Sequence, residues 1–129
     1  MPVIAGIDAP TFTLADTVFT GLATPSRGAV ENAVWRVRLT SSTPGALHTL
    51  DREEVLVAVR GAAVATLAGT EHAVAAGDAV LVPAGVPFAL RCAQPEDGSS
   101  PEFEAVAVLP VGGRACLVGG EPFTPPWAR

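Results

Sequence analysis

Residues 44–61 read Pro-Gly-Ala-Leu-His-Thr-Leu-Asp-Arg-Glu-Glu-Val-Leu-Val-Ala-Val-Arg-Gly, and this stretch decides the fold. It begins with a Pro-Gly turn signal and then places His48, Leu50 and Glu54 just before a valine-rich run. His48 and Leu50 are two positions apart, so in an extended strand their side chains lie on the same face. The stretch therefore predicts a strand that presents one imidazole beside an apolar side chain.

Short apolar runs between Gly and Pro residues predict strands rather than helices along most of the chain. Residues 34–40 alternate apolar side chains with Arg36 and Arg38, which is typical of a strand with two different faces. Residues 54–60 are apolar on both faces, so both faces need cover, and this favours a homodimer. Further strands are expected at 62–68, 71–75, 79–82 and 103–109, with turns at Gly61, Gly69-Thr70 and Gly77-Asp78.

Two segments are less regular. Residues 94–101 combine Pro, Gly, Ser and acidic residues and are interpreted as an exposed loop. The tail 121–129 is too rich in proline for a helix or a central strand, and we expect Phe123 and Trp127 to hold it against the body. The sequence thus predicts an all-β antiparallel fold in a single domain spanning residues 1–129.

Composition excludes several classes of function. The chain has 13 acidic residues against 8 arginines and a net charge of −5, which argues against a surface for nucleic acid. No apolar run approaches the ~20 residues that span a bilayer, and the first cation is Arg27, so no membrane segment or secretory signal is expected. Cys92 and Cys116 do not make a disulfide framework. We expect a cytoplasmic protein, and the lack of Lys with abundant Ala and Arg fits a high-GC bacterial genome.

A second stretch, residues 77–92, reads Gly-Asp-Ala-Val-Leu-Val-Pro-Ala-Gly-Val-Pro-Phe-Ala-Leu-Arg-Cys. The spacing of Gly77, Pro83 and Gly85, taken with residues 42–61, resembles the two signatures of the cupin family. Those signatures are Gly-x5-His-x-His-x3,4-Glu-x6-Gly and Gly-x5-Pro-x-Gly-x2-His-x3-Asn. The resemblance implies a small cupin-type antiparallel β-barrel, also described as a double-stranded β-helix or jelly roll.

The departures from the signatures all concern chemistry. Ser42 stands in place of the opening Gly, Leu50 and Phe88 in place of two histidines, and Cys92 in place of the Asn. Cupins that bind Fe, Mn, Ni or Zn use three histidines and the glutamate, and of these only His48 and Glu54 remain. Stable sites for such metals usually draw three or four protein ligands. We therefore expect no cofactor, with a divalent transition metal held by His48 and Glu54 as the alternative.

The resemblance places His48, Leu50, Glu54 and Phe88 inside the barrel, which would form an apolar cavity for a small organic metabolite. In this interpretation Glu54 orients His48, and the pair performs metal-independent acid–base catalysis. The arrangement resembles that of cupin sugar epimerases, which use a pair of a histidine and a carboxylate. Isomerisation, cyclisation and dehydration are the accessible reactions. Two alternatives stay open: a cupin that binds a metabolite without turnover, and a metal-dependent, dioxygenase-like cupin that recruits Cys92.

Other residues carry weaker hypotheses. Arg36 and Arg38 would bind a carboxylate or phosphate of the ligand if their strand face points inward, or form a solvated face if it points outward. Arg91 has the same two interpretations. Cys92 is either a nucleophile or soft ligand near the pocket mouth, or a buried inert thiol. His72 is expected at the surface, and Glu53 is expected to point away from Glu54 by strand alternation. Phe123 and Trp127 are expected to pack simply rather than to cover the barrel or line a dimer contact.

Overall fold

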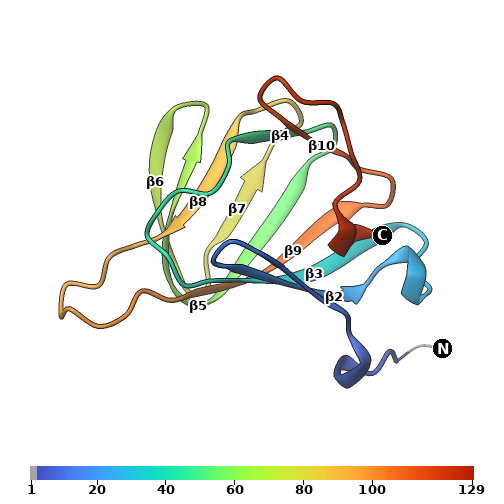
Figure 1. Ribbon diagram of the computed structural model, residues 1–129, viewed down its shortest axis with the longest axis horizontal. Helices are drawn as coiled ribbons and strands as arrows, with labels where there is room; N and C mark the ends of the chain where they lie inside the picture. Colours follow the sequence, from blue (N-terminus) through green and yellow to red (C-terminus); the bar gives the residue numbers. More distant parts are fainter. Residues whose placement is uncertain (1–2) are drawn as a thin grey trace.

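A computed structural model describes residues 3–129 as two antiparallel β-sheets that curl into a half-barrel (Figure 1). The first sheet has the strand order β1-β2-β3-β9-β5-β7 and the second has the order β10-β4-β8-β5-β6. The strands are β1 (Thr11–Leu14), β2 (Thr17–Ala23), β3 (Asn32–Leu39), β4 (His48–Leu50), β5 (Glu54–Leu67), β6 (Thr70–Ala75), β7 (Ala79–Val82), β8 (Phe88–Cys92), β9 (Phe103–Pro110) and β10 (Ala115–Leu117). Three short 3-10 helices complete the chain, η1 (Gly6–Asp8), η2 (Pro25–Arg27) and η3 (Pro126–Ala128). The all-β jelly roll expected from the sequence is confirmed.

Strand β5 belongs to both sheets, and the predicted turn at Gly61 is wrong. The strand bends at Gly61 instead of reversing, with a register shift against β9 between Ala58 and Arg60. Gly61 has a φ of 75°, and a Cβ atom there would lie 2.0 Å from the carbonyl oxygen of Glu102. A residue without a side chain is therefore required at this bend. The predicted strands at 54–60 and 62–68 are two halves of one strand that joins the sheets.

The core lies between the inner faces of the two sheets. On β3 every second side chain from Ala33 to Leu39 is buried, and on β9 the same alternation runs from Phe103 to Leu109. The second sheet adds Leu50, Phe88, Cys92, Ala63 and Ala65 to the same cluster. This period of two is the sequence signal that predicted strands with one buried face.

The tail lies across the end of the first sheet. Trp127 in η3 stacks on Phe19 of β2, with ring centroids 3.6 Å apart and an interplanar angle of 4°. Phe123 pairs through its backbone with Ala115, but its side chain is 37% exposed. The ring of Trp127 therefore holds the tail against the body as expected, whereas that of Phe123 does not. Residues 94–101 form the expected loop, mostly exposed and without regular structure. No helix within residues 3–129 is long and apolar enough to span a bilayer.

Candidate functional site

His48, Leu50 and Phe88 share the inner face of the second sheet. His48 is the first residue of β4 and pairs directly with Phe88 of β8. Their rings meet edge to face, with centroids 5.5 Å apart and an interplanar angle of 65°. Leu50 and Phe88 are buried, whereas His48 is half-buried and Leu117, its partner on β10, is 44% exposed. The imidazole therefore lies at an accessible rim of the inner surface.

A backbone carbonyl fixes the tautomer of His48. The imidazole Nδ1 lies 2.9 Å from the carbonyl oxygen of Ala46. A carbonyl only accepts hydrogen bonds, so Nδ1 must carry the proton and donate it. In the neutral ring the lone pair is then on Nε2, for which no hydrogen bond is found within residues 3–129. The neutral form of His48 therefore has its proton acceptor at Nε2.

Glu54 is a buried acid without a polar partner. It is the first residue of β5 and shares the inner face of the first sheet with Leu56 and Ala58. Its side chain is 5% exposed, and no hydrogen bond or ion pair to its carboxyl group is found in the described part of the chain. Its oxygens keep a little contact with solvent, because no fully buried side-chain oxygen there lacks a partner. Burial raises the pKa of Glu54 to about 8, because the charged form loses its hydration. Near neutral pH Glu54 is therefore mainly protonated.

The expected hydrogen bond between His48 and Glu54 is not found in the described residues. Within residues 3–129 the two side chains form no hydrogen bond or ion pair with each other, and the Ala46 carbonyl orients the imidazole instead. A carboxyl group that has lost its charge cannot supply the electrostatic stabilisation that would tie it to an imidazolium. The structure thus offers one proton acceptor and one proton donor as separate groups.

The arginines proposed for the ligand lie outside the barrel. Arg36 and Arg38 point away from the buried face of β3, so the hypothesis of an inward face is wrong. The Nε atom of Arg36 lies 3.2 Å from Glu104, and Arg38 lies 4.0 Å from Glu102. Alternation explains this result, because Trp35 and Val37 fill the inner side of the same strand. Arg91 likewise points outward, where an ion pair of 3.3 Å joins it to Glu71.

Cys92 is fully buried on β8, opposite Ala63. Burial raises the pKa of its thiol, which disfavours the nucleophilic thiolate. The structure therefore favours the buried inert thiol over the nucleophile or soft ligand. His72 is exposed, as the sequence predicted, and Glu53 is exposed whereas Glu54 is buried.

Comparison with known proteins gives the family. Residues 35–99, half of the chain, match the family model described as a cupin domain. The chain belongs to the cupin family. No curated protein matches the sequence.

Solved structures confirm the cupin fold. A polyketide cyclase, RemF from Streptomyces resistomycificus, superposes with a TM-score of 0.72 at 17% identity over 85% of this chain and 79% of that one. An RmlC-like cupin from Shewanella frigidimarina superposes with a TM-score of 0.68 at 15% identity, over 84% of this chain and 88% of that one. A salicylate 1,2-dioxygenase from Pseudaminobacter salicylatoxidans superposes with a TM-score of 0.67 at 17% identity, over 87% of this chain and 33% of that one. At these identities the likeness shows the fold alone.

The donors in this cupin do not fit the metal site that the family signatures describe. Within residues 3–129 no three side chains among His, Cys, Asp and Glu lie close enough together to hold a metal ion. The matching positions provide His48 and a carboxyl group that is protonated near neutral pH. A resident metal would need at least one further protein ligand and the charged form of Glu54.

Two surface pockets of this cupin were not foreseen from the sequence. One, of about 390 Å³, lies beside Leu50, between the loop that joins β7 to β8 at Ala84 and Gly85 and the side chains of Arg114 and Cys116. The other, of about 340 Å³, lies between the β1–β2 hairpin and the tail. Their walls come from segments distant in sequence, so no local motif marks them. In the sequence only Phe123 and Trp127 hinted at a feature near the tail, and they were interpreted as packing residues.

Proposed function

We propose that this cupin binds a small organic metabolite between the inner faces of its two sheets and acts on it by acid–base chemistry without a metal. The observation that carries the proposal is that two groups on the inner surface have opposite roles: one can accept a proton and the other can donate one. The neutral ring of His48 has its lone pair at Nε2, because Nδ1 donates to the Ala46 carbonyl. Glu54 keeps its proton near neutral pH, because it is buried without a polar partner.

In this mechanism His48 removes a proton from a carbon or hydroxyl of the substrate through Nε2. Glu54 donates its proton to the oxygen on which negative charge develops, and both groups return to their starting states after proton exchange with product and water. Nothing is oxidised or reduced. Isomerisation, cyclisation and dehydration all satisfy this proton balance.

The inner face also supports a class of substrate. The ring edge of Phe88 and the partly exposed Leu117 flank His48, so an apolar or planar molecule would be favoured there. The similar structure of a polyketide cyclase supports cyclisation as one reaction of this kind. We therefore propose an apolar substrate with an acidic C–H or O–H group.

An enolisable cyclic ketone such as 2-tetralone serves as a probe. The enzyme is incubated with the ketone in D2O, and the loss of its α-protons is followed by NMR. We expect His48→Gln to slow the catalysed exchange about 100-fold or more, because a positioned base contributes about 10²–10⁴. The control His72→Gln alters the exposed histidine of β6 and should leave the rate unchanged. Full activity of His48→Gln would refute the mechanism.

The metal-dependent alternative is tested on the same protein. Elemental analysis after purification without chelators measures bound metal, and the exchange rate is compared before and after treatment with EDTA. We expect an unchanged rate. Stoichiometric metal together with loss of activity in EDTA would show the metal-dependent cupin instead.

A binding module without turnover is the second candidate. It is favoured because no hydrogen bond or ion pair joins His48 and Glu54 within residues 3–129, so neither group activates the other directly. It predicts that a bound ketone gives chemical-shift changes at Phe88 without any exchange of its α-protons, and that Glu54→Gln changes only affinity.

We also propose that two copies associate through the outer face of the first sheet. Val57, Val59 and Leu81 are 39%, 50% and 59% exposed and belong to the neighbouring strands β5 and β7. A contiguous apolar sheet face of this kind is unusual at a free surface, and a second copy offers the same face in a two-fold contact. The acidic composition and the free cysteines support a cytoplasmic location.

A further inference from the structure

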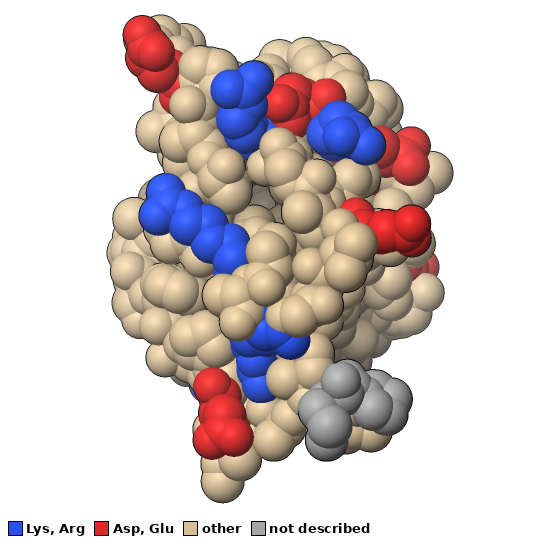
Figure 2. Space-filling model, turned by 90° about the vertical axis from the view of Figure 1, so that its right-hand side faces the viewer, with Lys and Arg blue, Asp and Glu red and all other residues tan. Residues whose placement is uncertain are grey.

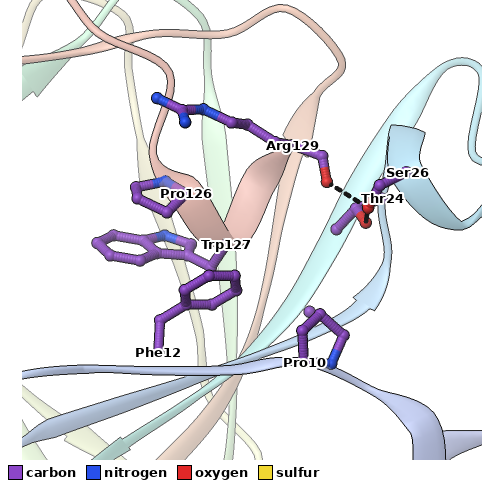
Figure 3. Close-up of a pocket in the computed structure, with 8 residues that line it drawn as sticks. Pro10, Phe12, Thr24, Ser26, Pro126, Trp127 and Arg129 are labelled. Carbon is purple, nitrogen blue, oxygen red and sulfur yellow. Dashed lines mark hydrogen bonds between the residues drawn. The ribbon is translucent and has the colours of Figure 1, made fainter.

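The pocket beside the tail lies outside the inner-face site and has a chemistry of its own. It has a volume of about 340 Å³, which suits a single substituted ring. Figure 3 shows its walls, which come from the β1–β2 hairpin, the segment around η2 and the tail. The lining residues are Pro10, Phe12, Gly21, Thr24, Ser26, Pro126, Trp127 and Arg129.

One wall is apolar and aromatic. Trp127 is fixed by its parallel stack on Phe19, and Phe12 pairs with Phe19 across the hairpin. In Figure 3 Phe12 and Pro126 lie on either side of the Trp127 indole. Flat, rigid side chains bind a planar ring with little loss of conformational entropy.

The opposite wall accepts hydrogen bonds. The Ser26 hydroxyl donates to the carbonyl oxygen of Arg129 at 2.8 Å, and Thr24 Oγ1 lies 3.2 Å from Ser26 Oγ. Because the Ser26 proton is already used, Thr24 must be the donor of the second bond. Both hydroxyl protons are therefore occupied, and what this wall offers to a ligand is oxygen lone pairs.

The wall is also held in place before any ligand binds. Thr24 is 1% exposed, and Arg27 of η2 donates to the carbonyl oxygen of Gly21 at 2.8 Å. A preformed wall lowers the entropy cost of binding.

A cation lies at the other end of the pocket. The Arg129 guanidinium forms no ion pair within residues 3–129, and Figure 3 shows it extending over Pro126, away from Thr24 and Ser26. Figure 2 shows the face on which the C-terminus lies, where arginine and acidic side chains are interspersed. An anion would therefore be attracted by the Arg129 guanidinium itself rather than by a positive face.

We propose that this pocket binds a small aromatic acid, whose ring packs against the edges of Trp127 and Phe12. Its carboxylate contacts the Arg129 guanidinium, and a hydrogen-bond donor at the opposite end of the ring, such as a hydroxyl, reaches the Ser26 oxygen, which the buried Thr24 holds in place. A ligand of this class matches the anion-binding end, the apolar wall and the accepting wall at the same time.

The test uses 4-hydroxybenzoate and its neutral analogue 4-hydroxybenzamide, with Kd measured by calorimetry. We expect Arg129→Gln to weaken 4-hydroxybenzoate about fivefold to tenfold and to leave 4-hydroxybenzamide unchanged, since it removes only a partly exposed charge-assisted contact. The matched control is Arg52→Gln, another exposed arginine without an ion pair in the described residues. Equal effects of the two substitutions, or no binding of 4-hydroxybenzoate to the unaltered protein, would overturn the proposal.

Intermolecular NOEs decide where the probe lies. Contacts from its ring protons to Trp127 and Phe12 support the pocket, and contacts to His48 and Phe88 instead would overturn it. His48→Gln should bind 4-hydroxybenzoate with unchanged Kd, which separates this site from the proposed acid–base site. Loss of binding in His48→Gln with retained folding contradicts the proposal.

Discussion

Replacement of Glu54 by glutamine should remove a specific pH dependence from the stability of the protein. The folded-state pKa of Glu54 is raised from 4.5 to about 8 by burial. Between these two values the folded protein retains a proton that the unfolded chain releases. The contribution of Glu54 to the free energy of unfolding is therefore largest below about pH 4.5, and it decreases as the pH rises toward 8.

The magnitude follows from the linkage relation. One proton difference corresponds to about 1.4 kcal/mol per pH unit. Over the interval from 4.5 to about 8 the loss of stability reaches at most about 5 kcal/mol. Glutamine keeps the size of the side chain but does not titrate, so Glu54→Gln should have a flatter stability profile across this interval.

Urea unfolding at pH 5, 6, 7 and 8 measures the difference. We expect the unaltered protein to lose stability relative to Glu54→Gln by about 1 kcal/mol for each pH unit in this range. A difference in the free energy of unfolding that stays the same at every pH reports only the effect of burying an amide in place of a carboxyl group. Glu53→Gln is the matched control, because its side chain is exposed one residue earlier, and its profile should follow that of the unaltered protein. Parallel profiles of Glu54→Gln and the unaltered protein would refute the assignment of a buried, protonated Glu54.

Three further predictions concern activity, folding and association. The proton exchange catalysed by the protein should fall above about pH 8 as Glu54 ionises, and a rate that keeps rising to pH 10 would contradict its role as the acid. Gly61→Ala should destabilise the protein by more than about 3 kcal/mol in thermal unfolding, because its Cβ would meet the backbone of Glu102. Gly69→Ala should cost only about 1 kcal/mol, since its left-handed backbone has open space around it. Val59→Glu should lower the apparent mass in sedimentation, whereas Val30→Glu, at an exposed valine outside the sheets, should not.

Much of the fold follows from local pattern. The period of two on β3 and β9 marks their buried faces, and the glycines at 69 and 77 mark turns that the structure contains. The chain around Gly61 is different. A glycine with a positive φ is typical of a turn, but the close approach of Glu102, 41 residues later and just before β9, makes Gly61 a bend within one long strand.

The sequence by itself determined which residues occupy the inner surface, because strand alternation and motif spacing place His48, Leu50 and Phe88 together. Tertiary structure decided the state of Glu54, because the surrounding core raises the pKa of its carboxyl group to about 8. The hydrogen bond from His48 to the Ala46 carbonyl spans only two residues and is local, although nothing in the sequence pattern marked it. Local pattern specifies the direction of a side chain, whereas its hydration depends on segments that meet only after folding. The pocket between Phe12, Thr24 and the tail arises for the same reason.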